Sequence, residues 1–131
     1  MTEGTSAVVS HRVDRAREVL EDAKLLAAAG RWRSCVNRLY YACFYSVSAL
    51  LASRGLSSSK HTGILSLFNV HFVKSGICSR EVAEVYNDLF DNRQEGDYAD
   101  FVTFSQGQVE PLVTKSELFV AAVIALIPQK P

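Results

Sequence analysis

Residues 37–55 read NRLYYACFYSVSALLASRG, and this stretch decides the fold. From Leu39 to Ala52 it is apolar almost all round the helical wheel, which a helix with a solvent-exposed face could not tolerate. The pattern therefore predicts a helix over about residues 32–53 that lies at the centre of a bundle and is covered by other helices.

The segments on either side of this stretch show the spacing of helices that bury one face. Gly30, Gly55 and Gly76 each follow a long periodic segment, and glycine closes helices because it adopts positive φ without strain. Apolar residues recur at intervals of three and four in four further segments. We expect these further helices over residues 10–29, 59–74, 79–97 and about 104–127.

Capping residues indicate where the helices begin. Ser10 or Asp14 is expected to open the first helix, and Ser79 the fourth, because their side-chain oxygens accept the unpaired amides of a first turn. In the last segment Thr103 and Gln106 have the spacing of a capping pair, but Pro111 predicts a kink or a late start.

No stretch alternates between apolar and polar residues as a strand does, and the connections between the segments are short. The predicted fold class is all-α: an antiparallel up-and-down helical bundle of four to five helices. Residues 1–9 are expected to form a flexible N-terminus, and residues 10–128 one helical bundle domain.

Composition narrows the classes of function. The 14 basic and 14 acidic residues balance, which argues against broad electrostatic capture of nucleic acid. The longest apolar run, Leu118 to Ile127, is about half of the roughly 20 residues that span a bilayer, and no signal peptide is recognisable, so we expect no membrane partner and a cytoplasmic location. Three cysteines without metal-ligand spacing indicate neither a disulfide framework nor a metal site.

The sequence contains no nucleotide-binding or hydrolase signature and implies no cofactor. The candidate functional residues are therefore the polar side chains that lie within apolar helices. Asn37 and Tyr41 share one face of the central helix, beside Arg38. These groups either tie neighbouring helices together by hydrogen bonds, the interpretation we favour, or bind a ligand.

A second polar group is expected at one pole of the bundle, where the end of the second helix, the start of the third and the end of the fourth meet. This topology brings His61 towards Arg93, Asp97 and Tyr98. Arginine suits the planar contact with phosphate, so the pole is a candidate anion site. The alternative is a network that caps helix ends.

Three motifs in order resemble the prokaryotic HEPN domains over about residues 12–127. They are NRLYYACF (37–44), KHTG (60–63) and RQEGDY (93–98). They are similar to the subgroup with Asn-Arg-x-Tyr-Tyr-Ala, a turn containing histidine, and Arg-x-x-x-Asp-Tyr. The resemblance implies a helical bundle, commonly a homodimer, that is often paired with a minimal nucleotidyltransferase in a toxin–antitoxin-like system.

The resemblance also implies site residues. Many members are metal-independent RNases with an arginine followed after four to six residues by a histidine; Arg93 matches the arginine, whereas Tyr98, Ala99 and Asp100 stand where the histidine belongs. Without that histidine, we expect Asp97 to be an orienting group and His61 to substitute as the acid–base group if it reaches the cleft. Tyr98 is the candidate acceptor for adenylate transferred by the partner.

Three hypotheses follow. The favoured one is a partner of a minimal nucleotidyltransferase that binds nucleotide or RNA phosphate in a polar cleft around Arg93. The binding residues are then Arg93, Tyr98, Asn37, Arg38 and Tyr41. The alternatives are a metal-independent endoribonuclease, with Arg93, Asp97 and His61 as catalytic residues, and a non-catalytic helical adaptor or dimerisation module that uses the apolar segment Leu118 to Ile127 for packing.

Overall fold

The computed structural model describes residues 2–98 and 103–128, and for residues 93–98 it describes the backbone alone. Within these ranges the chain forms helices and no strand, so the expected all-α class is confirmed. The elements are α1 (Glu3–Ala28), α2 (Trp32–Ser53), α3 (His61–Phe68), the π-helical turn η1 (Asn69–Val73), α4 (Arg80–Tyr98) and α5 (Gln106–Ala125).

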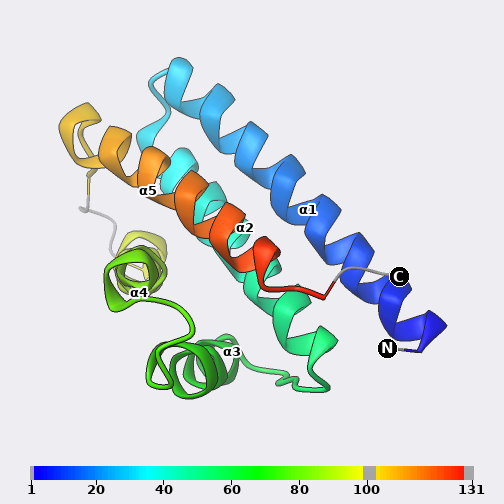
Figure 1. The fold of residues 1–131 in the computed structure, drawn as a ribbon. Coiled ribbons are helices and arrows are strands. Elements are labelled where there is room, and N and C mark those ends of the chain that lie inside the picture. Colours follow the sequence, from blue (N-terminus) through cyan, green and yellow to red (C-terminus); the bar gives the residue numbers. More distant parts are fainter. Residues whose placement is uncertain (1, 99–102, 129–131) are drawn as a thin grey trace.

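The arrangement of the helices places α2 at the centre, as its apolar surface requires. In Figure 1, α1, α2 and α5 run side by side, whereas α3 and α4 are seen nearly end-on and therefore lie across the other three. Twelve residues of α2 are buried, from Cys35 to Leu51, and they point to every side of the helix. The prediction of a central second helix is confirmed, and the crossing of α3 and α4 modifies the simple up-and-down arrangement.

The helix ends follow the predicted glycines, whereas two of the predicted starts were wrong. Gly30 and Gly55 have φ of 71° and 73°, and the following residues, Arg31 and Leu56, donate backbone hydrogen bonds back into the preceding helices. At α4, the Ser79 hydroxyl accepts from the amide of Val82 at 3.2 Å, as expected for a cap.

The first wrong start is that of α1, which begins at Glu3 and not at Ser10 or Asp14. The hydroxyl of Thr2 accepts from the amide of Thr5 at 3.1 Å and caps the helix. Residues 3–9, expected to be a flexible terminus, form the first turns of α1, and Val9 is buried.

The second wrong start is that of α5, where Ser105 and Gln108 form the capping box in place of Thr103 and Gln106. The helix begins at Gln106 and includes Pro111, so of the two expectations at this proline, a kink or a late start, the late start was wrong. The reciprocal hydrogen bonds of the box stabilise the first turn ahead of the proline.

The apolar run at the end of α5 is used largely within the chain. Phe119, Val120, Val123 and Ile127 are buried, whereas Leu118 is 64% exposed. This run therefore covers the chain's own core, which weakens the argument for dimer packing that rests on its length. Within the described ranges, no helix combines the length and apolarity needed to cross a bilayer.

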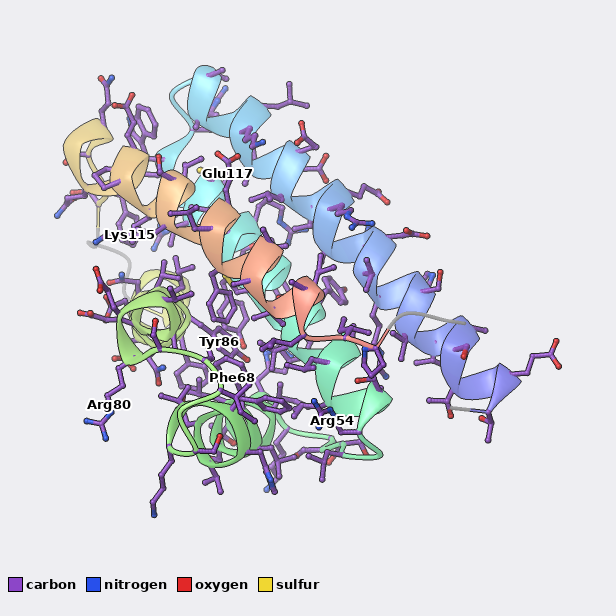
Figure 2. All side chains as sticks on the ribbon, viewed as in Figure 1. Arg54, Phe68, Arg80, Tyr86, Lys115 and Glu117 are labelled. Carbon is purple, nitrogen blue, oxygen red and sulfur yellow. The ribbon has the colours of Figure 1, made fainter. Side chains whose placement is uncertain are left out.

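An aromatic cluster joins α3, α4 and α5 on the side of α2 away from α1. Phe68 lies 5.9 Å from Tyr86 and 5.6 Å from Phe119 between ring centroids, and Figure 2 shows Phe68 and Tyr86 pointing into the interior. Tyr86 is fully buried, and its hydroxyl has no hydrogen-bond partner among the described residues. Burial raises the pKa of this phenol far above its usual range.

Because a buried hydroxyl without a partner costs free energy, Tyr86→Phe is expected to raise the free energy of unfolding by about 1 kcal/mol. Urea denaturation of the two proteins measures the difference. A loss of stability of similar size in Tyr86→Phe contradicts this account and indicates that a buried water satisfies the hydroxyl.

Candidate functional site

The first residue of α3 is hydrogen-bonded to the middle of α2. The Tyr40 hydroxyl lies 2.9 Å from Nδ1 of His61, and Tyr40 itself is fully buried. If Nδ1–H donates to the phenol oxygen, the neutral imidazole carries its proton on Nδ1 and Nε2 is unprotonated, because the bond made by one ring nitrogen sets the tautomer. In that tautomer Nε2 is the ring nitrogen that can accept a proton.

Aromatic rings hold the His61 imidazole in place. Phe44 stacks on it with ring centroids 4.3 Å apart, and Tyr41 meets it edge-on at 5.9 Å. His61 is half-buried in this position. A ring that is held by a hydrogen bond and two aromatic contacts keeps one orientation, which acid–base chemistry requires.

The glycine of the KHTG motif allows the preceding loop to pass over α3. A β-carbon at Gly63 would overlap the side chain of Ser58, so only a residue without a side chain fits. The Ser58 hydroxyl also accepts from the amide of Lys60 at 3.2 Å. This close approach fixes the start of α3 and with it the position of His61.

Arg38 lies on the same face of α2 as Tyr41. Its Nε and Nη2 donate to Oδ1 of Asn37 at 3.1 and 2.6 Å, and its guanidinium lies 5.1 Å from the centroid of the Tyr41 ring. In the described part of the chain, no carboxylate oxygen lies within 4 Å of this guanidinium. Arg38 is thus an oriented cation whose contacts are an amide and an aromatic ring.

These contacts correct two sequence-based interpretations. Asn37 was expected to tie helices together, but it accepts from its neighbour Arg38 within α2; the bond between helices comes from Tyr40. His61 was expected near the end of α2, whereas it meets the middle of that helix because α3 lies across it.

The structure brings together part of the predicted site. Asn37, Arg38, Tyr41 and His61 form one group, the His61 cluster, with Tyr40 and Phe44 as the members that sequence reasoning missed. The ring of Phe90 in α4 lies 6.2 Å from that of Tyr40, so the helix that carries Arg93 and Asp97 passes beside the cluster. The side chains of Arg93, Asp97 and Tyr98 lie outside the described residues.

A charge pattern that could have located the cluster is present in the sequence. Residues 23–80 contain no Asp or Glu, so all 14 acidic residues lie outside this segment. Acidic residues gather instead on α4, where burial and the neighbouring Glu84 and Asp91 raise the pKa of Asp88. The zero net charge of the chain hides this separation.

The cysteines are poorly suited to nucleophilic chemistry. Cys43 and Cys35 are buried, which raises the pKa of their thiols to about 12 and about 11. Among the residues whose side chains are described, no three histidine, cysteine or acidic side chains gather as a metal site needs. The chemistry available in the described cluster is that of imidazole, phenol and guanidinium.

Tyr40→Phe removes the hydroxyl that holds Nδ1 of His61 and leaves the aromatic packing in place. We expect the free energy of unfolding to fall by about 1 kcal/mol, because a buried hydrogen bond is lost. Urea denaturation measures this change, and the 15N chemical shifts of the His61 ring report the altered tautomer equilibrium. Unchanged ring shifts would contradict the assigned role of Tyr40.

Comparison with known proteins shows the family to which the chain belongs. The family model for the HEPN domain matches residues 9–126. A UPF0332 protein of Thermotoga maritima is 50% identical over 86% of this chain and 86% of its own length. A UPF0332 protein of Gloeobacter violaceus is 33% identical over 89% of this chain and 94% of its own. A protein of Methanocaldococcus jannaschii named "putative toxin" is 30% identical over 82% of this chain and 73% of its own. The chain belongs to the HEPN domain family.

Proposed function

We propose that this HEPN protein is the toxin-like member of a two-protein pair and binds a phosphate group of RNA or nucleotide in a cleft around Arg93. The observation that carries the proposal is the fixed His61 ring, hydrogen-bonded to Tyr40 beside Arg38. The helix that carries Arg93 packs on the same tyrosine through Phe90. The names of the M. jannaschii relatives agree with a toxin-like role.

A minimal nucleotidyltransferase is the partner that the resemblance implies, with Tyr98 as the acceptor of adenylate. Incubation of the protein with such an enzyme and ATP is expected to add one adenylate group, detected by mass spectrometry and located on Tyr98 by peptide mapping. Tyr98→Phe is expected to remove the modification, with Tyr45→Phe as the control. Unaltered labelling of Tyr98→Phe places the acceptor elsewhere.

A second candidate is a metal-independent endoribonuclease, and the Tyr40–His61 bond favours it. With Nδ1 bonded to Tyr40, proton exchange with RNA goes through Nε2. Nε2 takes the proton of the 2′-hydroxyl while the 2′-oxygen attacks phosphorus. The bond from phosphorus to the 5′-oxygen breaks, and that oxygen leaves with a proton from solvent. Arg93 stabilises the negative charge on the phosphorane, and Asp97 orients the Arg93 guanidinium.

RNA cleavage in the presence of a chelator separates these readings. If His61 is the acid–base group, His61→Asn lowers the cleavage rate by at least about 100-fold, because asparagine can keep the bond to Tyr40 but cannot exchange a proton. Arg93→Ala is expected to lower it similarly. His71→Ala and Arg80→Ala are the controls, since both residues are exposed and Figure 2 shows Arg80 pointing away from the core.

The same variants test the adaptor hypothesis when thermal stability and RNA binding are also measured. A folded wild-type protein that binds RNA without cutting it, with binding lost in Arg93→Ala, supports the phosphate-binding partner. If Arg93→Ala lowers only the melting temperature and leaves RNA binding unchanged, the cleft around Arg93 is refuted and the adaptor is supported.

A further inference from the structure

A cavity lies at the corner where α1 turns into α2. Its volume is about 320 Å³, and its lining consists of Leu26, Arg33, Ser34, Asn37 and Arg38. The lining therefore includes the guanidinium of Arg38, the hydroxyl of Ser34 and the amide of Asn37, and it includes no carboxylate. This donor set suits an anion with several oxygen atoms.

The guanidinium of Arg38 is oriented before any ligand arrives. Oδ1 of Asn37 accepts from Nε and Nη2, and the ring of Tyr41 supports the group at 5.1 Å. A guanidinium has five N–H groups, and the contact with Asn37 uses two of them. The three others, on Nη1 and Nη2, include the pair that can bind two phosphate oxygens side by side.

The charge around Arg38 differs from that around two cations of α1, Arg15 and Lys24. Arg15 is paired with Glu18 at 3.1 Å, and Lys24 is paired with Glu21 at 3.1 Å and Glu117 at 3.0 Å. Arg38 is half-buried and, among the residues that the structure describes, has no such pair. Because segment 23–80 contains no acidic residue, neither α2 nor α3 can supply one. A partly buried cation of this kind favours an external anion.

We propose that this cavity, the Arg38 subsite, binds a phosphate group of a nucleotide or an RNA strand. Arg38 binds two oxygens of the phosphate, Ser34 contributes a further donor, and Asn37 is a positioning residue that orients Arg38. The proposal rests on the proposed function for the source of the phosphate. Tyr41 connects the two sites, because its ring contacts both Arg38 and the ring of His61 at 5.9 Å.

Titration of the 15N-labelled protein with inorganic phosphate, AMP and a short single-stranded RNA tests the subsite. We expect the Arg38 side-chain signals to shift with all three probes, and Arg38→Ala to weaken phosphate binding about tenfold or more. Arg38→Lys is expected to recover little of this affinity, because an ammonium lacks the planar fork. Arg54→Ala is the matched control, since Arg54 also lies over an aromatic ring, Phe72, but outside the cavity.

The role of Asn37 has its own readout. Asn37→Ala is expected to weaken phosphate binding severalfold and to shift the Arg38 Nε signal in the absence of ligand. Asn37→Asp keeps an acceptor oxygen for Arg38 but adds a negative charge that neutralises the site, so it is expected to bind phosphate no better than Asn37→Ala. An unchanged Nε signal in Asn37→Ala overturns the positioning role.

Equal phosphate affinity of Arg38→Ala and the wild type overturns the subsite. This result is distinguishable from failure of the proposed function. Phosphate binding that depends on Arg38 but not on Arg93 supports the subsite and refutes the Arg93 cleft, and dependence on Arg93 alone does the reverse. Much tighter binding of the RNA than of AMP, both dependent on Arg38, identifies the strand as the source of the phosphate, whereas equal binding identifies a mononucleotide.

Discussion

The apolar surface of α2 has to be covered on every side, and the rest of the fold depends on this constraint. Leu39, Val47 and Leu50 are fully buried, and α1, α4 and α5 together remove the helix from water. At about 25 cal/mol per Å² of apolar area removed from water, such burial is the main favourable contribution to folding. The turns at Gly30 and Gly55 reverse the chain at the two ends of α2, so that the helices before and after it can pack against it.

Polar groups in so apolar a helix need partners, and the partners give the fold its details. The Tyr40 hydroxyl is paired with His61, and the buried Ser46 donates to the carbonyl of Cys43 at 2.7 Å within the helix. Because Tyr40 lies in the middle of α2, its hydrogen bond to His61 holds the start of α3 against that part of the helix. Tyr86 shows the opposite case, a buried hydroxyl without a partner in the described residues, held in place by the packing of its ring against Phe68 and Phe119.

The same face of α2 combines rigid aromatic packing with positive charge. Tyr41 contacts both the Arg38 guanidinium and the His61 ring, so one residue holds a cation and an imidazole near each other. The absence of acidic residues between positions 23 and 80 leaves this face without charge compensation from its own segment. A half-buried arginine beside an imidazole suits the binding of phosphate, which is the function we propose for this member of the HEPN family.

The sequence by itself determined the helical class, the central position of α2, the glycines that end the helices and the family, because hydrophobic periodicity and short motifs act locally along the chain. It did not reveal that Thr2 and Ser105 cap the outer helices, because several residues near each end could serve as caps. Only the tertiary structure decided that His61 pairs with Tyr40 and that Asn37 accepts hydrogen bonds from Arg38. Those pairs depend on how α3 crosses α2 and on rotamers within a packed face, and neither is a function of spacing along the chain.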